Sequence, residues 1–104
     1  RMASFLLVAA YFCKNIEVIK FLVKRGSSIN KTDVFGFNAV MSVVLNENMD
    51  VDTKIKTIEF LADNGCDINW MTCLGETALT MALAKADVKI ANFLLDKGAV
   101  LYKK

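Results

Sequence analysis

Apolar residues recur at helical spacing three times along the chain. In the first segment, residues 16–26, apolar side chains fall at positions i, i+3, i+6 and i+7: Ile16, Ile19, Leu22 and Val23. This spacing places them on one face of an α-helix. Residues 55–65 and 88–98 align with this segment, and the same residue types coincide in all three: Phe21, Phe60 and Phe93, then Leu22, Leu61 and Leu94. The pattern predicts three helices related by an internal repeat, with offsets of 39 and 33 residues.

Glycine residues stand at fixed positions in this pattern. Each of the three segments ends in a glycine: Gly26, Gly65 and Gly98. Glycine suits the left-handed position that follows a helix, where a Cβ atom would be unfavourable. A second glycine follows the first two after ten residues: Gly36 and Gly75. Asn and Asp residues stand in the links between each pair, so the sequence predicts a turn at each link.

A shorter helical run precedes each longer segment: residues 3–11, 38–45 and 77–85. Asn38 and Thr77 begin the second and third runs, where their side-chain oxygens suit an N-cap. Six additional residues lie within 46–53, between the two helices of the middle unit, and we expect Asp50 or Asp52 to cap the following helix. The repeating unit is therefore a turn, a short helix, a longer helix and a glycine.

The three units account for the whole chain. We predict one domain over residues 1–104, with an incomplete repeat over about 1–32, a repeat over 33–71 that holds the insertion, and a repeat over 72–104. The first repeat lacks its leading turn, and Arg1 starts in the middle of the pattern. We therefore expect the sequence to be a fragment of a longer chain.

The sequence resembles the ankyrin repeat family in all three units. The matching motifs are Gly75-Glu76-Thr77-Ala78-Leu79-Thr80-Met81-Ala82 in the third repeat, Gly65-Cys66-Asp67-Ile68-Asn69 in the second and Ser28-Ile29-Asn30 in the first. No repeat has the Pro and His of the family's T-P-L-H-x-A motif, and Val100-Leu101-Tyr102 replaces the usual Asp-Ile-Asn turn in the third. The resemblance implies an all-α, ankyrin-like solenoid of helix-turn-helix repeats with short β-hairpin-like turns.

The repeat pattern also predicts which side chains form the core. We expect these residues to be buried: Leu7, Ala10, Ile19, Phe21, Leu22, Val40, Ile58, Leu61, Leu79, Ala82, Phe93 and Leu94. The stability of such a stack comes from the interfaces between neighbouring repeats. The family resemblance implies that Asn30 and Asn69 stabilise the hairpin turns, with asparaginyl hydroxylation as a second interpretation.

Composition narrows the range of functions. The chain has no His, and its five glycines are spread along it, so we expect no catalytic centre, no cofactor and no metal site. Glu47, Asp50 and Asp52 lie close in sequence, but without the glycine and distant Glu of an EF-hand loop they indicate a solvated loop. A net charge of +2 argues against nucleic acid. The longest apolar stretch, Phe5 to Cys13, is too short to insert across a membrane, and it predicts a buried helix instead.

The three cysteines indicate a compartment. Cys13, Cys66 and Cys73 form no C-x-x-C pair, and their odd number argues against a disulfide framework. Free thiols persist in a reducing environment, so we expect an intracellular, cytoplasmic protein.

Charge is distributed unevenly along the chain. The net charge is +5 over residues 1–31, −5 over 32–71 and +2 over 72–104. This distribution either orients a charged partner or draws neighbouring repeats together.

The predicted turns carry apolar residues where polar ones are expected. The two tips are Asp33-Val34-Phe35-Gly36-Phe37 and Trp70-Met71-Thr72-Cys73-Leu74-Gly75-Glu76. In ankyrin-like stacks, hairpin tips and the inner face of the first helices form the concave surface where partners bind. We therefore predict a partner-binding site made of the tips and the ends of the first helices: Val34, Phe35, Phe37, Trp70, Met71, Leu74, Glu76, Leu45 and Lys85. The alternatives are that Trp70 folds back on a neighbouring hairpin and that Phe35 packs against an adjacent repeat that lies outside this sequence.

These observations predict a non-catalytic protein–protein interaction module that binds a protein partner of unknown identity. The alternative is an intramolecular role, in which the repeats dock on other domains of a larger enzyme, channel or effector. We expect no nucleic-acid partner and no membrane insertion. Self-association through exposed terminal repeats is a further expectation.

Overall fold

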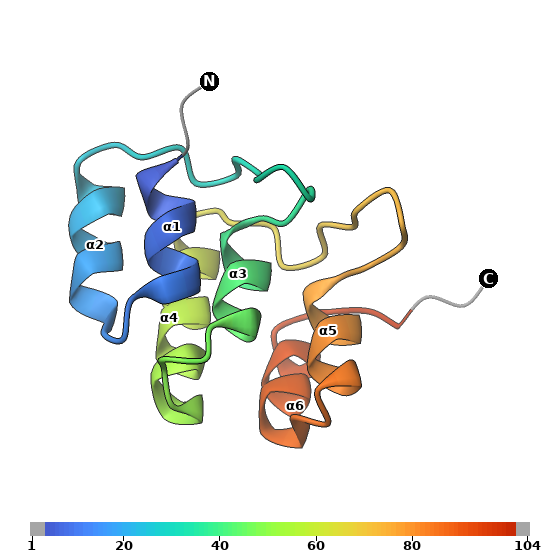
Figure 1. The fold of residues 1–104 in the computed structure, drawn as a ribbon. Helices are drawn as coiled ribbons and strands as arrows, with labels where there is room; N and C mark the ends of the chain where they lie inside the picture. Colours follow the sequence, from blue (N-terminus) through green and yellow to red (C-terminus); the bar gives the residue numbers. More distant parts are fainter. Residues whose placement is uncertain (1–3, 102–104) are drawn as a thin grey trace.

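A computed structural model describes residues 4–101, which form six α-helices and no strand. The helices are α1 (Phe5–Phe12), α2 (Ile16–Lys24), α3 (Ala39–Leu45), α4 (Val51–Asp63), α5 (Ala78–Ala84) and α6 (Val88–Asp96). Each odd-numbered helix packs on the next one in the chain, and the longer links between these pairs lie together along one end of the molecule (Figure 1). This arrangement confirms the predicted all-α helical repeat fold. The predicted Tyr102 turn and the start of the first repeat extend beyond the described residues.

The helix pairs stack side by side in chain order. α1 packs on α3 and α3 on α5, which forms one row of helices (Figure 1). α2 packs on α4 and α4 on α6, which forms a second row. Because each repeat contacts only its sequence neighbours, stability in residues 4–101 depends on the interfaces between successive repeats.

Polar side chains begin every one of these helices. An oxygen of each N-cap residue accepts a hydrogen bond from a backbone N–H of the first turn: Ser4, Asn15, Asn38, Asp50, Thr77 and Asp87. The predicted caps Asn38 and Thr77 are confirmed, and Asp50 rather than Asp52 caps α4. Thr77 and Thr80 also exchange side-chain and backbone hydrogen bonds in a capping box. Thr80 thus contributes the bond at the position where the family motif has His.

The three predicted helix-ending glycines adopt a left-handed conformation. Gly26, Gly65 and Gly98 have φ angles of 98°, 98° and 101°. The residue after each glycine donates its N–H to the carbonyl of an aligned leucine: Leu22, Leu61 or Leu94. This wrapped C-cap satisfies carbonyls that the helix leaves unpaired, so the repeat of glycine in the sequence reflects a repeat of backbone geometry.

Nine of the twelve predicted core residues are buried: Leu7, Ala10, Ile19, Val40, Ile58, Leu61, Leu79, Ala82 and Leu94. Leu22 and Phe93 are half-buried and pack against this core. The core runs continuously through the stack, because the buried faces of α1, α3 and α5 meet those of α2, α4 and α6.

The prediction that Phe21 belongs to the core is wrong, since its side chain is 57% exposed. Its counterpart in the second repeat, Phe60, is half-buried and lies under Lys20 of the preceding repeat, with Nζ 5.8 Å from the ring centroid. Phe21 occupies the same position in the first repeat, at the end of the stack, where no described repeat precedes it.

The insertion adds a loop and one extra helical turn. α4 has 13 residues, whereas α2 and α6 have nine each. Asn46 begins the loop and is fully buried. Its amide group donates to the carbonyls of Ala10 (2.9 Å) and Cys13 (2.8 Å), and its Oδ1 accepts from the N–H groups of Asn48 and Met49. The insertion is therefore tied to the end of α1.

The extra turn also buries a lysine that sequence reasoning missed. Lys54 is 6% exposed, and its Nζ donates a 2.8 Å hydrogen bond to the carbonyl of Val44 in the last turn of α3. A cation is favourable at that helix end because unpaired carbonyls point outward there. Burial nevertheless lowers the pKa of the Lys54 ammonium group, with nearby Lys85 acting in the same direction. The aligned positions in the other repeats are Asn15 and Asp87, which are N-caps.

Candidate protein-binding groove

Two aligned side chains fold the hairpin tips. The Oδ1 of Asp33 accepts from the N–H groups of Phe35 (2.9 Å) and Phe37 (3.0 Å), and the backbone N–H of Asp33 donates to the carbonyl of Phe37. In the second tip, Thr72 Oγ1 accepts from the N–H groups of Leu74 and Glu76. The backbone N–H groups of each tip thus find hydrogen-bond acceptors within the tip itself. The side chains at the end of the tip are not needed for these bonds and face solvent.

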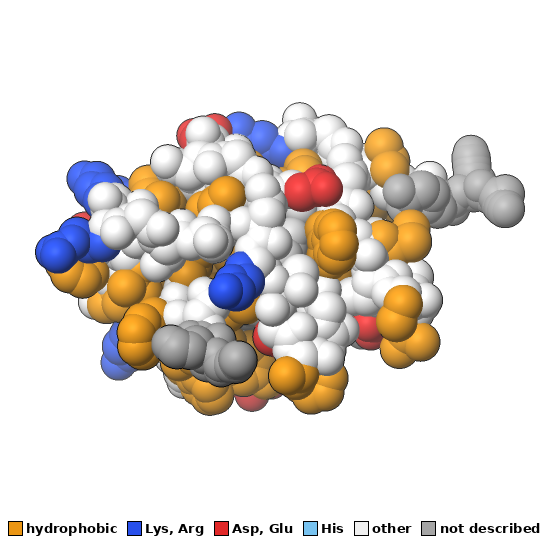
Figure 2. Space-filling view, turned by 90° about the horizontal axis from the view of Figure 1, so that it is seen from above, with side chains coloured by type: hydrophobic (Ala, Val, Ile, Leu, Met, Phe, Trp, Pro, Cys, Tyr) orange, Lys and Arg blue, Asp and Glu red, His pale blue; other side chains and the backbone are white. Residues whose placement is uncertain are grey.

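Apolar side chains project from both tips, as the sequence predicts. Val34 is 94% exposed, Phe35 is 71% exposed and Leu74 is 81% exposed. Phe37 is half-buried, and its ring centroid lies 5.6 Å from that of Phe35. Figure 2 looks down on this end of the molecule and shows hydrophobic side chains standing among uncharged and charged ones. The alternative in which Phe35 packs against an adjacent repeat outside this sequence is not tested by residues 4–101.

An open groove of about 740 Å³ runs between the first tip and the helices α1 and α3. The tip contributes Val34, Phe35 and Phe37, and the end of α3 contributes Leu45. These are four of the nine predicted site residues, and the structure brings them together. Three exposed or partly exposed side chains of α1 complete the apolar lining: Val8, Tyr11 and Phe12.

Sequence reasoning missed the contribution of α1 because it interpreted this helix as buried. Leu6, Leu7, Ala9 and Ala10 are indeed buried. However, Tyr11 is 43% exposed and Phe12 is 60% exposed. The available signal was that α1 is apolar at every position from Phe5 to Phe12, whereas packing on α2 and α3 covers only part of a helix surface.

The second tip is held against the first. Trp70 Nε1 donates a 2.7 Å hydrogen bond to the carbonyl of Gly36. This bond confirms the alternative in which Trp70 folds back on the neighbouring hairpin, although 40% of its surface stays exposed. Met71 and Leu74 are exposed beside it, and Glu76 Oε1 accepts from the hydroxyl of Thr72. These four predicted site residues lie outside the groove lining.

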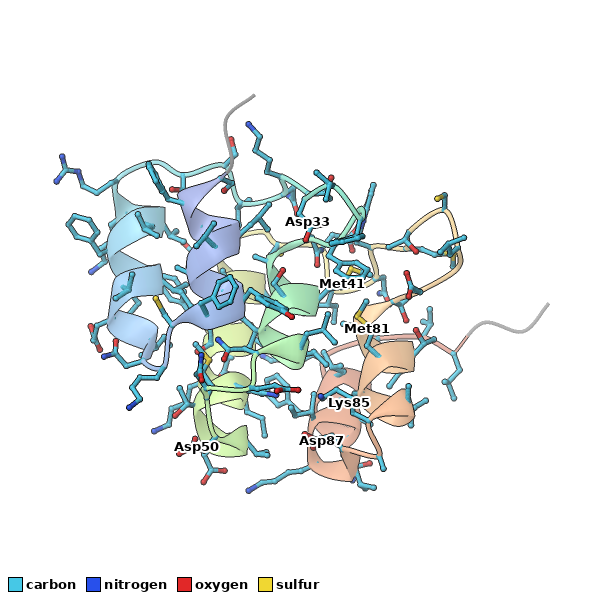
Figure 3. The ribbon with its side chains drawn as sticks, viewed as in Figure 1. Asp33, Met41, Asp50, Met81, Lys85 and Asp87 are labelled. Carbon is cyan, nitrogen blue, oxygen red and sulfur yellow. The ribbon has the colours of Figure 1, made fainter. Side chains whose placement is uncertain are left out.

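Lys85 stands apart from the other predicted site residues. It is the C-cap of α5, and Figure 3 places it at the opposite end of the molecule from Asp33 in the first tip. Its side chain is exposed. The groove and tips therefore form one surface, and Lys85 does not extend it.

The hairpin asparagines join successive repeats. Asn30 donates to the carbonyl of Gly65 (3.0 Å) and accepts from the N–H of Asp67 (3.0 Å). Asn69 makes the equivalent pair of bonds to Gly98 and Val100. These contacts bear out the stabilising role that the family resemblance implies, and they fix the spacing of the two tips.

The groove is mostly uncharged. Lys31 and Asp33 are the ionisable residues in its lining besides Tyr11, and one carboxylate oxygen of Asp33 is already engaged by the tip backbone. The acidic residues of the insertion have structural roles instead. Hydrogen bonds from Thr53 hold the pKa of the Asp50 carboxyl below its usual value, and Asp52 pairs with Lys89.

Within residues 4–101, no group of three potential ligands could hold a metal ion. Ion pairs cross from the second repeat to the third: Asp52 with Lys89 at 2.8 Å and Glu59 with Lys97 at 3.5 Å. These contacts support the interpretation that opposite charge draws neighbouring repeats together.

The fold and the repeat contacts define a helical repeat protein with an exposed apolar groove. A family model for ankyrin repeats, in three copies, matches residues 6–104, so the chain belongs to the ankyrin repeat family. It is 35% identical over 99 residues to the putative ankyrin repeat protein FPV242 of fowlpox virus (strain NVSL), which covers 94% of this chain and 25% of that protein. It is 31% identical over 104 residues to the putative ankyrin repeat protein R664 of Acanthamoeba polyphaga mimivirus, which covers 98% of this chain and 62% of that protein.

The chain thus spans less than two thirds of the length of both relatives. Among residues 4–101, none of the helices has the length and apolar character needed to cross a membrane. Ankyrin repeats are generally protein–protein interaction modules and are generally non-catalytic.

Proposed function

We propose that this chain is a non-catalytic protein-interaction module that binds an apolar segment of a partner protein in the groove between the first tip and α1. The observation that carries the proposal is the set of exposed apolar side chains around one concave space: Val8, Tyr11, Phe12, Val34 and Phe35. Contiguous apolar surface of this kind marks interaction sites on soluble proteins.

The residue types support the same function. Aromatic side chains dominate the binding energy of many protein interfaces, especially where they lie near the centre in a concave setting. Tyr11, Phe12, Phe35 and Phe37 come from two separate segments and converge on this groove. Asp33 Oδ1 accepts a hydrogen bond within the tip, and Asn30 Oδ1 accepts one from the N–H of Asp67 in the next repeat. These bonds hold the tip in place, so little conformational entropy is lost when a partner binds.

The experiment is affinity capture from native cell lysate with three forms of the chain. The first is the wild type, and the second carries Phe12→Ser and Phe35→Ser in the groove. The third carries Val88→Ser, which removes an apolar side chain of α6 that is 67% exposed and does not line the groove. Circular dichroism first establishes that all three are folded.

We expect a partner that wild type and the Val88→Ser control both retain and that the groove variant loses. Equal capture by all three forms would contradict a site in the groove. Loss of capture by the Val88→Ser variant alone would instead move the site to the surface around Val88.

A further inference from the structure

A second exposed apolar surface lies at the N-terminal end of the stack, on α2. It consists of Val18, Phe21 and Arg25, which we call the N-terminal face. Val18 is 41% exposed and Phe21 is 57% exposed. None of these three residues lines the groove, so this face is a separate surface.

In the second and third repeats, a preceding repeat covers the positions that align with Val18 and Phe21. The counterparts of Val18 in the second and third repeats are Thr57 and Ile90, and both are fully buried. The counterparts of Phe21 are Phe60 and Phe93, and both are half-buried. In each case the second helix of the preceding repeat packs on the helix that carries them, since α2 contacts α4 and α4 contacts α6.

Arg25 and Lys97, which are aligned, each place a cation near the ring of the aligned Phe. The Arg25 guanidinium lies 5.6 Å from the ring centroid of Phe21, and the Lys97 ammonium lies 5.9 Å from that of Phe93. Lys97 in addition pairs with Glu59 of the preceding repeat, at 3.5 Å. Within residues 4–101, Arg25 has no carboxylate at the corresponding distance.

One of the two internal interfaces pairs opposite charges at these positions. Where the later repeat has the cation Lys97, the preceding repeat offers the carboxylate of Glu59. Where the later repeat has the neutral Asn64 at the aligned position, the preceding repeat offers Lys20, which lies over Phe60 instead. Arg25 carries a cation at the position of Lys97, so the Glu59–Lys97 pair is the precedent for an acidic residue at the position equivalent to Glu59.

We propose that the N-terminal face receives one more ankyrin-type repeat, joined ahead of residue 4, whose second helix places a carboxylate against Arg25 and apolar side chains over Val18 and Phe21. The occupant is argued from the continuity of this face with the α2–α4 and α4–α6 interfaces, which repeat the same positions twice in register. The proposal is independent of the partner that binds in the groove.

The test adds a second copy of residues 4–37 directly ahead of residue 4. This copy is one repeat long and already presents its far side to a following repeat in the native stack. It also places the copied Lys20 at the position equivalent to Glu59, opposite Arg25. Lys20→Glu in the copy alone supplies the required carboxylate, and the unchanged copy is the matched control.

We expect the extended chain with Lys20→Glu in the copy to unfold in one transition, with a midpoint about 10 °C above that of the 104-residue chain. The control with Lys20 unchanged should show a smaller rise, and 1 M NaCl should narrow the gap between the two because salt screens the Arg25 contact. Phe21→Asp, introduced at the original position, should lower the midpoint more in the extended chain than in the 104-residue chain.

Three outcomes would overturn the proposal. The first is an added repeat that stays exchange-labile by hydrogen exchange or leaves the midpoint unchanged. The second is equal stabilisation at low salt by the added repeat with Lys20→Glu and by the added repeat with Lys20 unchanged, because Arg25 would then not require a carboxylate. The third is a dimer of the 104-residue chain in sedimentation that Phe21→Asp dissociates, because a second copy would then be the occupant of the face.

Discussion

Asn46 offers the sharpest test of how the insertion supports the groove. It is fully buried and follows Leu45, which lines the groove. The substitution Asn46→Ala removes four hydrogen bonds. Two of them are buried, the bond to the carbonyl of Ala10 and the bond from the N–H of Met49, and two are partly buried.

The expected loss in the free energy of unfolding follows from the two buried hydrogen bonds. A buried polar group that loses its partner costs about 1–3 kcal/mol, whereas partly buried groups recover hydrogen bonds to water. Two such groups, the Ala10 carbonyl and the Met49 N–H, give a loss of about 3 kcal/mol in the free energy of unfolding. For a chain of this size the midpoint of thermal unfolding should fall by about 10–20 °C.

The assay is urea unfolding followed by circular dichroism, with Asn48→Ala as the control. Asn48 is exposed and donates one bond, to the carbonyl of Phe12, so its loss should cost less than about 1 kcal/mol. Asn46→Asp keeps the two accepted bonds but buries a charge and loses both donors, so it should be at least as damaging as alanine. If Asn46→Ala proved no more destabilising than Asn48→Ala, the reasoning would be refuted.

Three further predictions follow from single residues. Replacing Gly26 with Ala should lower the free energy of unfolding by about 1–2 kcal/mol, because φ is 98° there although no atom crowds the site; denaturant unfolding checks this, with Ser27→Ala as the control. Replacing Trp70 with Phe should cost about 1 kcal/mol by losing the bond to Gly36, and faster amide exchange in the first tip would report it, whereas unchanged exchange would contradict it. Burial lowers the pKa of Lys54 from its ordinary value of 10.5, so the unfolded chain binds more protons between the two values and the free energy of unfolding should rise with pH in that window. Lys54→Met should remove this contribution, and an identical pH slope in both proteins would show that Lys54 is not its source.

The sequence was sufficient to predict the helices, their order and the N-caps Asn38 and Thr77. Leu61 and Gly65 have identical counterparts at the aligned positions of the other repeats, and the aligned glycines share the same left-handed backbone geometry. The error at Phe21 has a different origin. A repeat pattern assigns the same environment to aligned residues, but a stack has two ends, and burial there depends on what lies beyond the described repeats.

The candidate groove was predicted only in part for a related reason. The apolar tip was visible because Phe35 and Val34 break the usual polarity of turns. Tyr11 and Phe12 carried no such signal, because apolar residues in a helix normally indicate core. Lys54 and Asn46 were missed because their roles depend on contacts across the insertion, whose path the repeat pattern does not constrain.

The hydrogen bonds of the tips connect the groove to the rest of the stack. The first tip is folded locally by Asp33, but its position relative to the second tip is set by Trp70 and Asn30, which bond across the repeat boundary. A partner that contacts Phe35 therefore binds a surface whose geometry depends on the neighbouring repeat. Binding should consequently slow amide exchange in the second tip as well as the first, since any opening of that repeat boundary would release the tip that the partner holds.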